Sequence, residues 1–189
     1  MARTPSTMVA LGTPAPAFDL PDAKSREHVT LDDFAEAKAL LVMFICNHCP
    51  YVQHVHPALQ QLGRDYHAER RGKGGGLAIV GINANDIVAY PDDAPGKMAL
   101  QGYNFPYLFD ETQAVAKAYN AACTPDFFLY DKSRRLAYRG QFDASRPNSG
   151  IPVTGADLRA AIDAVLAGKE ISGEQKPSLG CNIKWKQDV

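Results

Sequence analysis

The 189-residue sequence has no long hydrophobic run, no excess of charge of either sign and few cysteines. No segment approaches the roughly 18 apolar residues that a membrane-spanning helix needs, and residues 1–11 lack the basic and apolar stretches of a secretory signal. The formal net charge is −1, and no basic stripe marks a nucleic-acid surface. We therefore expect a cytoplasmic protein with neither a membrane nor a nucleic-acid partner.

Cysteine is scarce, with only four in the chain. That number is too low for a small domain held together by disulfides. In a reducing compartment, two cysteines at close spacing are more often redox-active or metal-bound than structural. The remaining composition, 46% hydrophobic and 22% charged, is ordinary for a globular protein.

Two of the cysteines form the motif Cys46-Asn47-His48-Cys49. The apolar run 39–45 precedes the motif and predicts a buried strand. Pro50 follows it and opens a pattern typical of a helix. Strand, CxxC and helix in this order indicate a dithiol redox site. We expect Cys46 to lie at the helix N-terminus, where the helix dipole favours the reactive thiolate.

Hydrophobic periodicity predicts alternating strands and helices, and hence an α/β fold. Apolar residues at 52, 55, 59, 62 and 66 define one face of a helix that reaches about residue 70, and Pro57 should kink it. Residues 1–17 form an irregular lead-in, 73–76 a flexible turn and 91–95 a loop, and the last 20 residues have no strong period. The expected strands are 18–20, 28–31, 40–45, 77–82, 107–109, 127–130 and 136–139. The expected further helices are 32–34, 97–103, 111–119 (with Ala114, Val115 and Ala118 facing inward) and 155–167.

Four segments carry a resemblance to a known family. They are residues 44–52 around the CxxC motif, Gly81–Asp86, Cys123–Phe128 and Gly180–Lys186. The chain resembles the thioredoxin-like superfamily, and more closely its bacterial peroxiredoxin-like (AhpC/TSA-like) members. This implies a central mixed sheet flanked by helices, with an N-terminal hairpin extension and a C-terminal tail. We expect a single domain over residues 1–189, with its core at about 13–168 and the tail at 169–189.

The chemistry of the motif assigns roles to its members. Cys46 is the candidate nucleophile and Cys49 the resolving thiol, since a mixed disulfide at Cys46 can be released by a thiol one helical turn away. His48 could stabilise the thiolate if protonated, or it could be an exposed histidine with little effect. We expect no metal, because His54 and His56 lie two apart and do not share a helix face well. A CxxC-His haem motif is absent as well, so we expect no cofactor.

Further roles follow only from the resemblance. It places a cis-proline at Pro125, facing the CxxC motif, and makes Thr124 and Pro125 part of a substrate groove. It also suggests Arg139 as a thiolate-stabilising cation, against the alternative of an exposed strand arginine.

Cys123 and Cys181 are candidate auxiliary thiols. Four cysteines allow three full pairings, of which Cys46–Cys49 with Cys123–Cys181 is the most economical. The alternative is a buried, inert Cys123 and a free Cys181 in the tail.

Three functions compete. The first is a thiol–disulfide oxidoreductase acting on a disulfide-bearing protein or a small thiol, with a thioredoxin-type or glutathione-type reducing partner. Leu40 and Ile45 stand where thioredoxin has a buried acid and a tryptophan. The second is an antioxidant thiol peroxidase with Cys46 as the peroxidatic cysteine. Ala39 and Met43 replace the proline and the hydroxyl residue of peroxiredoxins. The third is a non-enzymatic redox sensor or metal-binding module.

Overall fold

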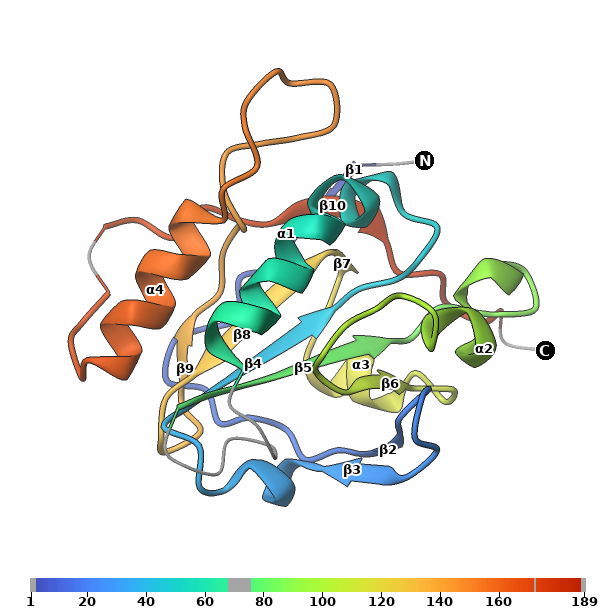
Figure 1. Ribbon diagram of the computed structural model, residues 1–189, viewed down its shortest axis with the longest axis horizontal. Helices are drawn as coiled ribbons and strands as arrows, with labels where there is room; N and C mark the ends of the chain where they lie inside the picture. The colour runs from blue at the N-terminus through green and yellow to red at the C-terminus, as the bar shows by residue number, and fades with distance from the viewer. Residues whose placement is uncertain (1–2, 68–75, 172, 188–189) are drawn as a thin grey trace.

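The computed structural model describes residues 3–67, 76–171 and 173–187. A five-stranded sheet with the order β6-β5-β4-β8-β9 lies at its centre (Figure 1). Its strands are Ala39–Phe44 (β4), Leu77–Asn83 (β5), Tyr107–Phe109 (β6), Asp126–Tyr130 (β8) and Leu136–Tyr138 (β9). Strand β5 pairs in parallel with β4 and β6, whereas β8 pairs antiparallel with β4 and β9. The predicted mixed sheet of a thioredoxin-like α/β fold is confirmed.

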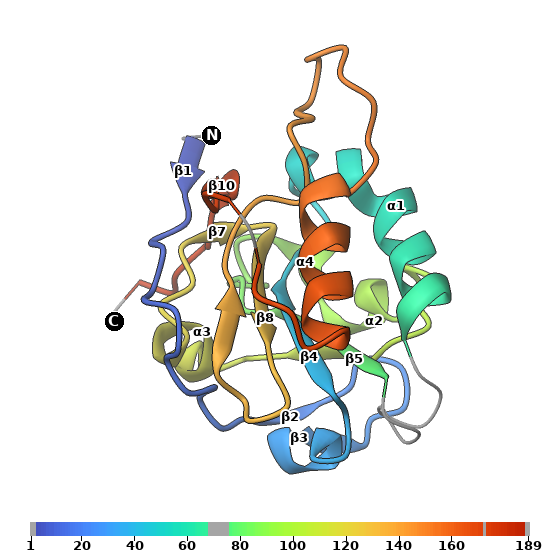
Figure 2. The ribbon, with the colours of Figure 1, turned by 90° about the vertical axis from the view of Figure 1, so that its left-hand side faces the viewer.

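Helices cover both faces of this sheet. Helices α1 (Pro50–Tyr66) and α4 (Ala156–Leu166) lie on one face (Figure 2). The short helix α3 (Ala114–Ala118) covers the other. So does the N-terminal hairpin β2–β3 (Asp19–Pro21 and His28–Thr30), which leads into the 3₁₀ turn η1 (Leu31–Phe34). A strand buried on both faces reads as a continuous apolar run, which is why the sequence of β4 shows no alternation.

Side chains of β4 divide between the two faces in the order that a period of two requires. Leu41 and Met43 join the core beneath α1 and α4. Leu40, Val42 and Phe44 join the core beneath α3 and the hairpin. The apolar face predicted for α1 is confirmed, because Val52, Val55, Leu59 and Leu62 are buried. The two packed cores hold the carboxyl end of β4, and therefore the CxxC motif, in a fixed position.

Both ends of the chain contain a strand that the sequence did not predict. Strands β1 (Arg3–Pro5) and β10 (Leu179–Asn182) pair antiparallel with each other, and β10 pairs antiparallel with β7 (Cys123–Thr124). The prediction of an irregular lead-in was therefore wrong at Arg3–Pro5. The tail, whose sequence has no strong period, contains a strand at Leu179–Asn182. Such short strands form through pairing with distant segments, so they leave no periodic signal in the sequence.

Several expected elements differ in detail. The expected loop at 91–95 contains a 3₁₀ turn, η2 (Pro91–Asp93), and the helix expected at 97–103 is α2 (Pro95–Met98), which begins with a proline. In α3, Ala116 is buried while Ala114 and Ala118 are exposed, so the predicted inward face was wrong at these two alanines. Val115 is half-buried and packs against the core, as predicted. Helix α1 ends at Tyr66, and the turn expected at 73–76 lies largely outside the described residues. None of the described helices is long and apolar enough to span a membrane.

Candidate active site: the dithiol at the head of helix α1

The two cysteines of the CxxC motif lie between strand β4 and helix α1, against Thr124 of β7. Cys46 comes two residues after the end of β4, and Cys49 is the N-cap residue of α1. The Sγ atom of Cys46 is 3.3 Å from Oγ1 of Thr124. The Cys49 thiol donates a hydrogen bond of 3.1 Å to the Thr124 carbonyl oxygen. One residue of β7 therefore contacts both sulfurs, which are 1% and 0% exposed at the residue level.

The hydrogen bond between the two thiols favours the thiolate at Cys49 rather than at Cys46, contrary to the sequence-based expectation. Cys49 is the N-cap residue of α1, and the free N–H groups of the first helical turn follow Pro50, which has none. Hydrogen bonding from Cys46, with smaller contributions from Cys181, Thr124 and the Val52 N–H, outweighs burial and lowers the pKa of Cys49 to about 5. Burial raises the pKa of Cys46, and its hydrogen bond to Cys49 raises it further. When the dithiol loses one proton, Cys49 is therefore the thiolate, and the remaining proton, shared between the two sulfurs, stays on Cys46.

His48 forms an ion pair with a carboxylate that sequence reasoning missed. Its Nδ1 atom is 2.5 Å from Oδ2 of Asp93, which is fully buried. The other carboxylate oxygen accepts hydrogen bonds from the backbone N–H groups of Asn47 and His48, at 2.7 and 3.2 Å. Asn85 donates to Oδ2 at 2.8 Å. The His48 ring stacks on Tyr90 with 4.7 Å between centroids. Asp93 thereby fixes the two residues between the cysteines.

Asp93 lies in a segment predicted only as a loop, so no local pattern singled it out. The nearest signal is the motif Gly81–Asp86. Within that motif, Asn83 donates to the Asp93 carbonyl and Asn85 to its carboxylate.

Cys46, His48 and Asp93 each place a potential metal ligand within 4.8 Å of the other two. This set is one ligand short of a tetrahedral zinc site. The Asp93 carboxylate already accepts four protein hydrogen bonds. We therefore interpret Asp93 as a residue that positions the CxxC loop. The predicted absence of a metal stays a prediction. His54 and His56 bond elsewhere, to Ser145 and to the Gln101 carbonyl.

The Thr124–Pro125 peptide bond is cis, as the resemblance implies. Pro125 follows the residue that contacts both sulfurs, and it lines a small cavity of about 20 Å³ between α1 and the segment after β9. The roles predicted for Thr124 and Pro125 in substrate binding stay predictions. The geometry places Thr124 directly against the dithiol, with Pro125 next to it in the chain.

The side chains of the two remaining cysteines, Cys123 in β7 and Cys181 in β10, point to opposite faces of the β7–β10 pair. In the β10–β7 pairing, Cys181 is opposite Thr124, and Asn182 is opposite Cys123. Adjacent residues of a strand point to opposite faces, so Cys181 shares a face with Thr124 while Cys123 points away. This register opposes a Cys123–Cys181 disulfide. Cys181 instead interacts with the thiol of Cys49. Both cysteines are buried.

Arg139 is buried rather than exposed, and its partners lie away from Cys46. Its Nη2 atom is 3.1 Å from Oδ2 of Asp126, and both side chains are fully buried. The same atom donates to the Asn120 carbonyl, and the guanidinium lies 4.1 Å from the ring centroid of Phe128. Among the described contacts of Arg139, none involves Cys46. These contacts indicate a structural ion pair.

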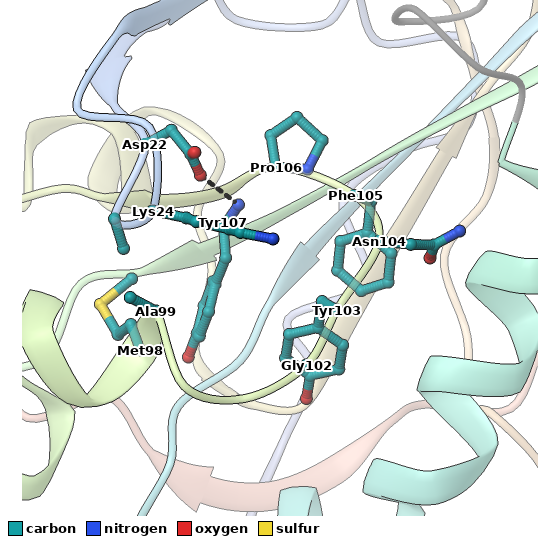
Figure 3. A pocket seen from close by; sticks show the side chains of 11 residues that line it. Asp22, Lys24, Met98, Ala99, Gly102, Tyr103, Asn104, Phe105, Pro106 and Tyr107 are labelled. Atoms are coloured by element: carbon teal, nitrogen blue, oxygen red, sulfur yellow. Dashed lines mark hydrogen bonds between the residues drawn. The ribbon is translucent and has the colours of Figure 1, made fainter.

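A pocket of about 240 Å³ lies between the segment around Asp22 and the segment from Met98 to Tyr107 (Figure 3). Tyr103, Phe105 and Tyr107 form part of its wall, and the backbone N–H of Tyr107 donates to Asp22. The Tyr107 hydroxyl donates to the Ile45 carbonyl and to Oδ1 of Asn47. The aromatic wall therefore supports the loop that carries Cys46 from the side opposite Thr124.

The comparisons with known proteins agree with this site. Residues 10–157 match the Redoxin family. The chain belongs to the Redoxin family. Thiol-disulfide oxidoreductase ResA of Geobacillus kaustophilus is 31% identical over 131 residues, which cover 69% of this chain and 68% of that protein.

Two solved structures extend the comparison. A hypothetical protein from Sinorhizobium meliloti is 52% identical, with a TM-score of 0.92 over 98% of this chain and 100% of that one. A thiol:disulfide interchange protein DsbE from Chlorobium tepidum shares the fold, at 23% identity and a TM-score of 0.64, over 84% of this chain and 99% of that one. This Redoxin-family chain is thus a thioredoxin-superfamily, AhpC/TSA-like protein with a CxxC motif. Its single-domain organisation and cytoplasmic location stay predictions.

Proposed function

We propose that the protein is a thiol–disulfide oxidoreductase in which Cys46 is the nucleophile and Cys49 the resolving thiol. One observation carries the proposal: Thr124 contacts both sulfurs of the CxxC motif at the head of α1. The similarity to ResA, a thiol–disulfide oxidoreductase, supports it. The expected substrate is a disulfide, and the expected reductant is of the thioredoxin or glutathione type.

The shared proton of the dithiol gives each cysteine its role. Transfer of that proton from Cys46 to Cys49 makes Cys46 a thiolate, which attacks one sulfur of the substrate disulfide while the other leaves as a thiolate. Loss of a proton from Cys49 then generates the second nucleophile, and the Thr124 and Val52 hydrogen bonds, which lower the pKa of Cys49, do not depend on the Cys46 thiol. Cys49 attacks Cys46 in the mixed disulfide and releases the remaining substrate thiolate. The substrate gains two electrons, and the protein is left with a Cys46–Cys49 disulfide.

His48 and Asp93 act by holding the loop between the cysteines. Both the Asn47 and His48 backbone N–H groups bind the Asp93 carboxylate, which fixes the distance between Cys46 and Cys49. Asp93 also raises the pKa of Cys46, although less than burial and the hydrogen bond to Cys49 do. We assign both as positioning residues.

A hollow on the surface next to His48 suits a protein substrate. It has a volume of about 820 Å³ and is lined in part by Val88, Tyr90 and Trp185. Val88 is 90% exposed and Trp185 is 40% exposed. Tyr90 joins this hollow to the dithiol, because its ring stacks on His48. A substrate that docks here is separated from Cys46 by the Tyr90 and His48 side chains.

Thiol peroxidase activity is the second candidate, and one observation favours it. Thr124 supplies a hydroxyl 3.3 Å from the Cys46 sulfur, although Met43 replaces the hydroxyl residue within the usual motif. In that reaction a peroxide would oxidise Cys46 to a sulfenic acid, and Cys49 would condense with it to a disulfide and release water. Against this candidate, Arg139 pairs with Asp126 rather than with Cys46.

Single cysteine replacements test the proposal. Cys46→Ser is expected to abolish reduction of insulin or of a small aromatic disulfide, and Cys49→Ser to trap a mixed disulfide at Cys46. Cys123→Ser, whose side chain points away from the dithiol, is the matched control and should retain activity. Full disulfide reductase activity in Cys46→Ser would show that the assignment is wrong. Rapid turnover of hydrogen peroxide without disulfide reduction would select the peroxidase.

A further inference from the structure

Strand β10 brings a third cysteine to the dithiol from a segment more than 130 residues away in sequence. Cys181 is 2% exposed and lies in the same packed cluster as Cys46 and Cys49, beneath α1. Its register partner is Thr124, the residue that contacts both CxxC sulfurs. Cys181 and Thr124 point to the same face of the β7–β10 pair. The pairing of β10 with β7 therefore places the Cys181 thiol on the same side as the Cys46–Cys49 dithiol.

Gly180 permits this close approach. A Cβ atom at position 180 would overlap the carbonyl oxygen of Thr124 and crowd the Pro125 nitrogen. Both are backbone atoms, which cannot move aside without displacing the residue that contacts the two sulfurs. Glycine at position 180 thus lets β10 lie close enough for Cys181 to interact with Cys49.

Cys123 provides the internal contrast. It is the same type of residue, is buried and lies on the neighbouring strand β7. Its register partner is Asn182, so it points to the opposite face, where its thiol contacts the Pro125 carbonyl at 3.6 Å. Cys181 shares a face with Thr124 and forms a hydrogen bond with Cys49, whereas burial, more than the charge of Cys49, raises the pKa of Cys123.

We propose that Cys181 is a third redox-active thiol, which forms a disulfide with Cys49 in exchange for the Cys46–Cys49 disulfide. This inference rests on the proposed function. The Cys181 thiolate attacks the Cys49 sulfur, so the Cys49–Cys181 bond forms as the Cys46–Cys49 bond breaks. Cys46 leaves as a thiolate and accepts the proton that Cys181 lost. The exchange is internal, so the protein stays oxidised by two electrons and needs no further oxidant.

Oxidation of the CxxC pair makes this exchange easier. In the reduced protein, burial raises the pKa of Cys181 to about 12, and the hydrogen bond to Cys49 and the charge of Cys49 contribute to that rise. The Cys46–Cys49 disulfide carries no charge, so both contributions of Cys49 disappear when it forms. Lys184 lowers the pKa of Cys181 and continues to do so. Cys181 is thus easier to ionise when its target disulfide is present.

The exchange gives the oxidised protein a reduced Cys46. The oxidising equivalent is then stored in a buried Cys49–Cys181 disulfide, while Cys46 can attack a second substrate disulfide. A mixed disulfide formed in this state lacks a free Cys49, so it persists until the thioredoxin-type or glutathione-type reductant reduces the Cys49–Cys181 disulfide to two thiols. Cys181 thereby controls how long a substrate stays attached, which favours rearrangement of substrate disulfides over simple reduction.

Disulfide mapping in full-length variants tests this inference. Purified Cys46→Ser protein is oxidised with diamide, the remaining thiols are alkylated, and cross-linked peptides are identified by mass spectrometry. We expect a Cys49–Cys181 disulfide. It should be lost in Cys46→Ser/Cys181→Ser and retained in the matched control Cys46→Ser/Cys123→Ser. A Cys49–Cys123 bond, or a Cys49 that stays reduced beside a reduced Cys181, would overturn the proposal.

The wild-type protein provides a second readout that does not depend on a substitution. Partial oxidation should yield both the Cys46–Cys49 and the Cys49–Cys181 peptides, and Cys181→Ser should leave only the first. A wild-type protein with the Cys46–Cys49 couple alone contradicts the role of Cys181 but keeps the proposed function. A protein with no Cys46–Cys49 couple contradicts the proposed function itself.

Discussion

Replacement of Thr124 by valine tests how the fold tunes the dithiol. The valine side chain has nearly the same shape as threonine but removes the hydroxyl that lies 3.3 Å from the Cys46 sulfur. The backbone carbonyl that accepts the hydrogen bond from Cys49 remains. The Thr124 hydrogen bond lowers the pKa of Cys46, opposing burial and the neighbouring charges. Its loss therefore destabilises the reduced form of the site more than the disulfide.

The expected size of the effect follows from the strength of one hydrogen bond. A hydrogen bond contributes a net ~1 kcal/mol, in a range of ~0.5–1.5 kcal/mol. For a two-electron couple, ~1.4 kcal/mol corresponds to ~30 mV. Thr124→Val should thus lower the reduction potential of the Cys46–Cys49 couple by about 20 mV. The direction is negative because the reduced form loses the stabilisation.

A redox titration against glutathione buffers measures this shift. Thr13→Val is the matched control, because it removes a hydroxyl that bonds only to the Ala10 carbonyl in its own exposed loop. The control should leave the potential unchanged. An unchanged or more positive potential in Thr124→Val, with the cis-proline loop intact by NMR, would show that the Thr124 hydroxyl does not stabilise the reduced dithiol.

Three further predictions concern stability. Gly180→Ala should lower the free energy of unfolding by about 1–3 kcal/mol, because its Cβ meets the backbone of β7, and it should reduce the yield of the Cys49–Cys181 disulfide. Arg139→Met should cost about 3–5 kcal/mol in urea unfolding, because it leaves the Asp126 carboxylate buried without its cation. That loss should shrink at low pH, since burial raises the pKa of Asp126 and protonation removes the charge. Burial lowers the pKa of His67 from 6.5 to about 4, so the unfolded chain binds a proton at a higher pH than the folded protein does. The free energy of unfolding should therefore fall by about 2 kcal/mol as the pH is lowered from 6.5 to about 4.

Each of these has a control of the same residue type. Gly96→Ala places its Cβ in open space, Arg135→Met removes an exposed arginine, and His28→Gln removes an exposed histidine. An effect of Gly180→Ala equal to that of Gly96→Ala would contradict the close approach of β10. Equal losses for the two arginine variants would contradict the buried ion pair. A stability profile between the two pH values that is unchanged in His67→Gln would contradict the role assigned to His67.

The sequence alone predicted those parts of the fold and the site for which local pattern and chemistry agree. The apolar run before Cys46 predicted β4, the 3–4 spacing of apolar residues predicted α1, and the CxxC motif identified the redox site. These signals are carried by neighbouring residues, and tertiary contacts reinforced them. The resemblance added the cis-proline at Pro125, which local sequence alone disfavours.

The remaining features of the site arise from contacts between distant segments. Asp93 reaches the CxxC loop from a short 3₁₀ turn, and Cys181 reaches it through the pairing of β10 with β7. Neither segment has a hydrophobic period, so no local pattern predicted its place in the fold. The thiolate was predicted at Cys46. The helix was predicted to begin at Pro50, as observed, but the hydrogen bond from Cys46 lowers the pKa of Cys49 instead.

A redox titration shows whether Cys46 and Cys49 form a reversible redox couple. The wild-type protein is equilibrated in glutathione buffers of graded potential, and its disulfides are identified by mass spectrometry at each point. We expect a reversible two-electron transition in which a Cys46–Cys49 disulfide forms, with a single defined midpoint for the oxidation of the reduced protein. This expectation is contradicted if Cys46 and Cys49 never join at any potential, or if peroxide converts Cys46 to a stable sulfenic acid that Cys49 does not resolve.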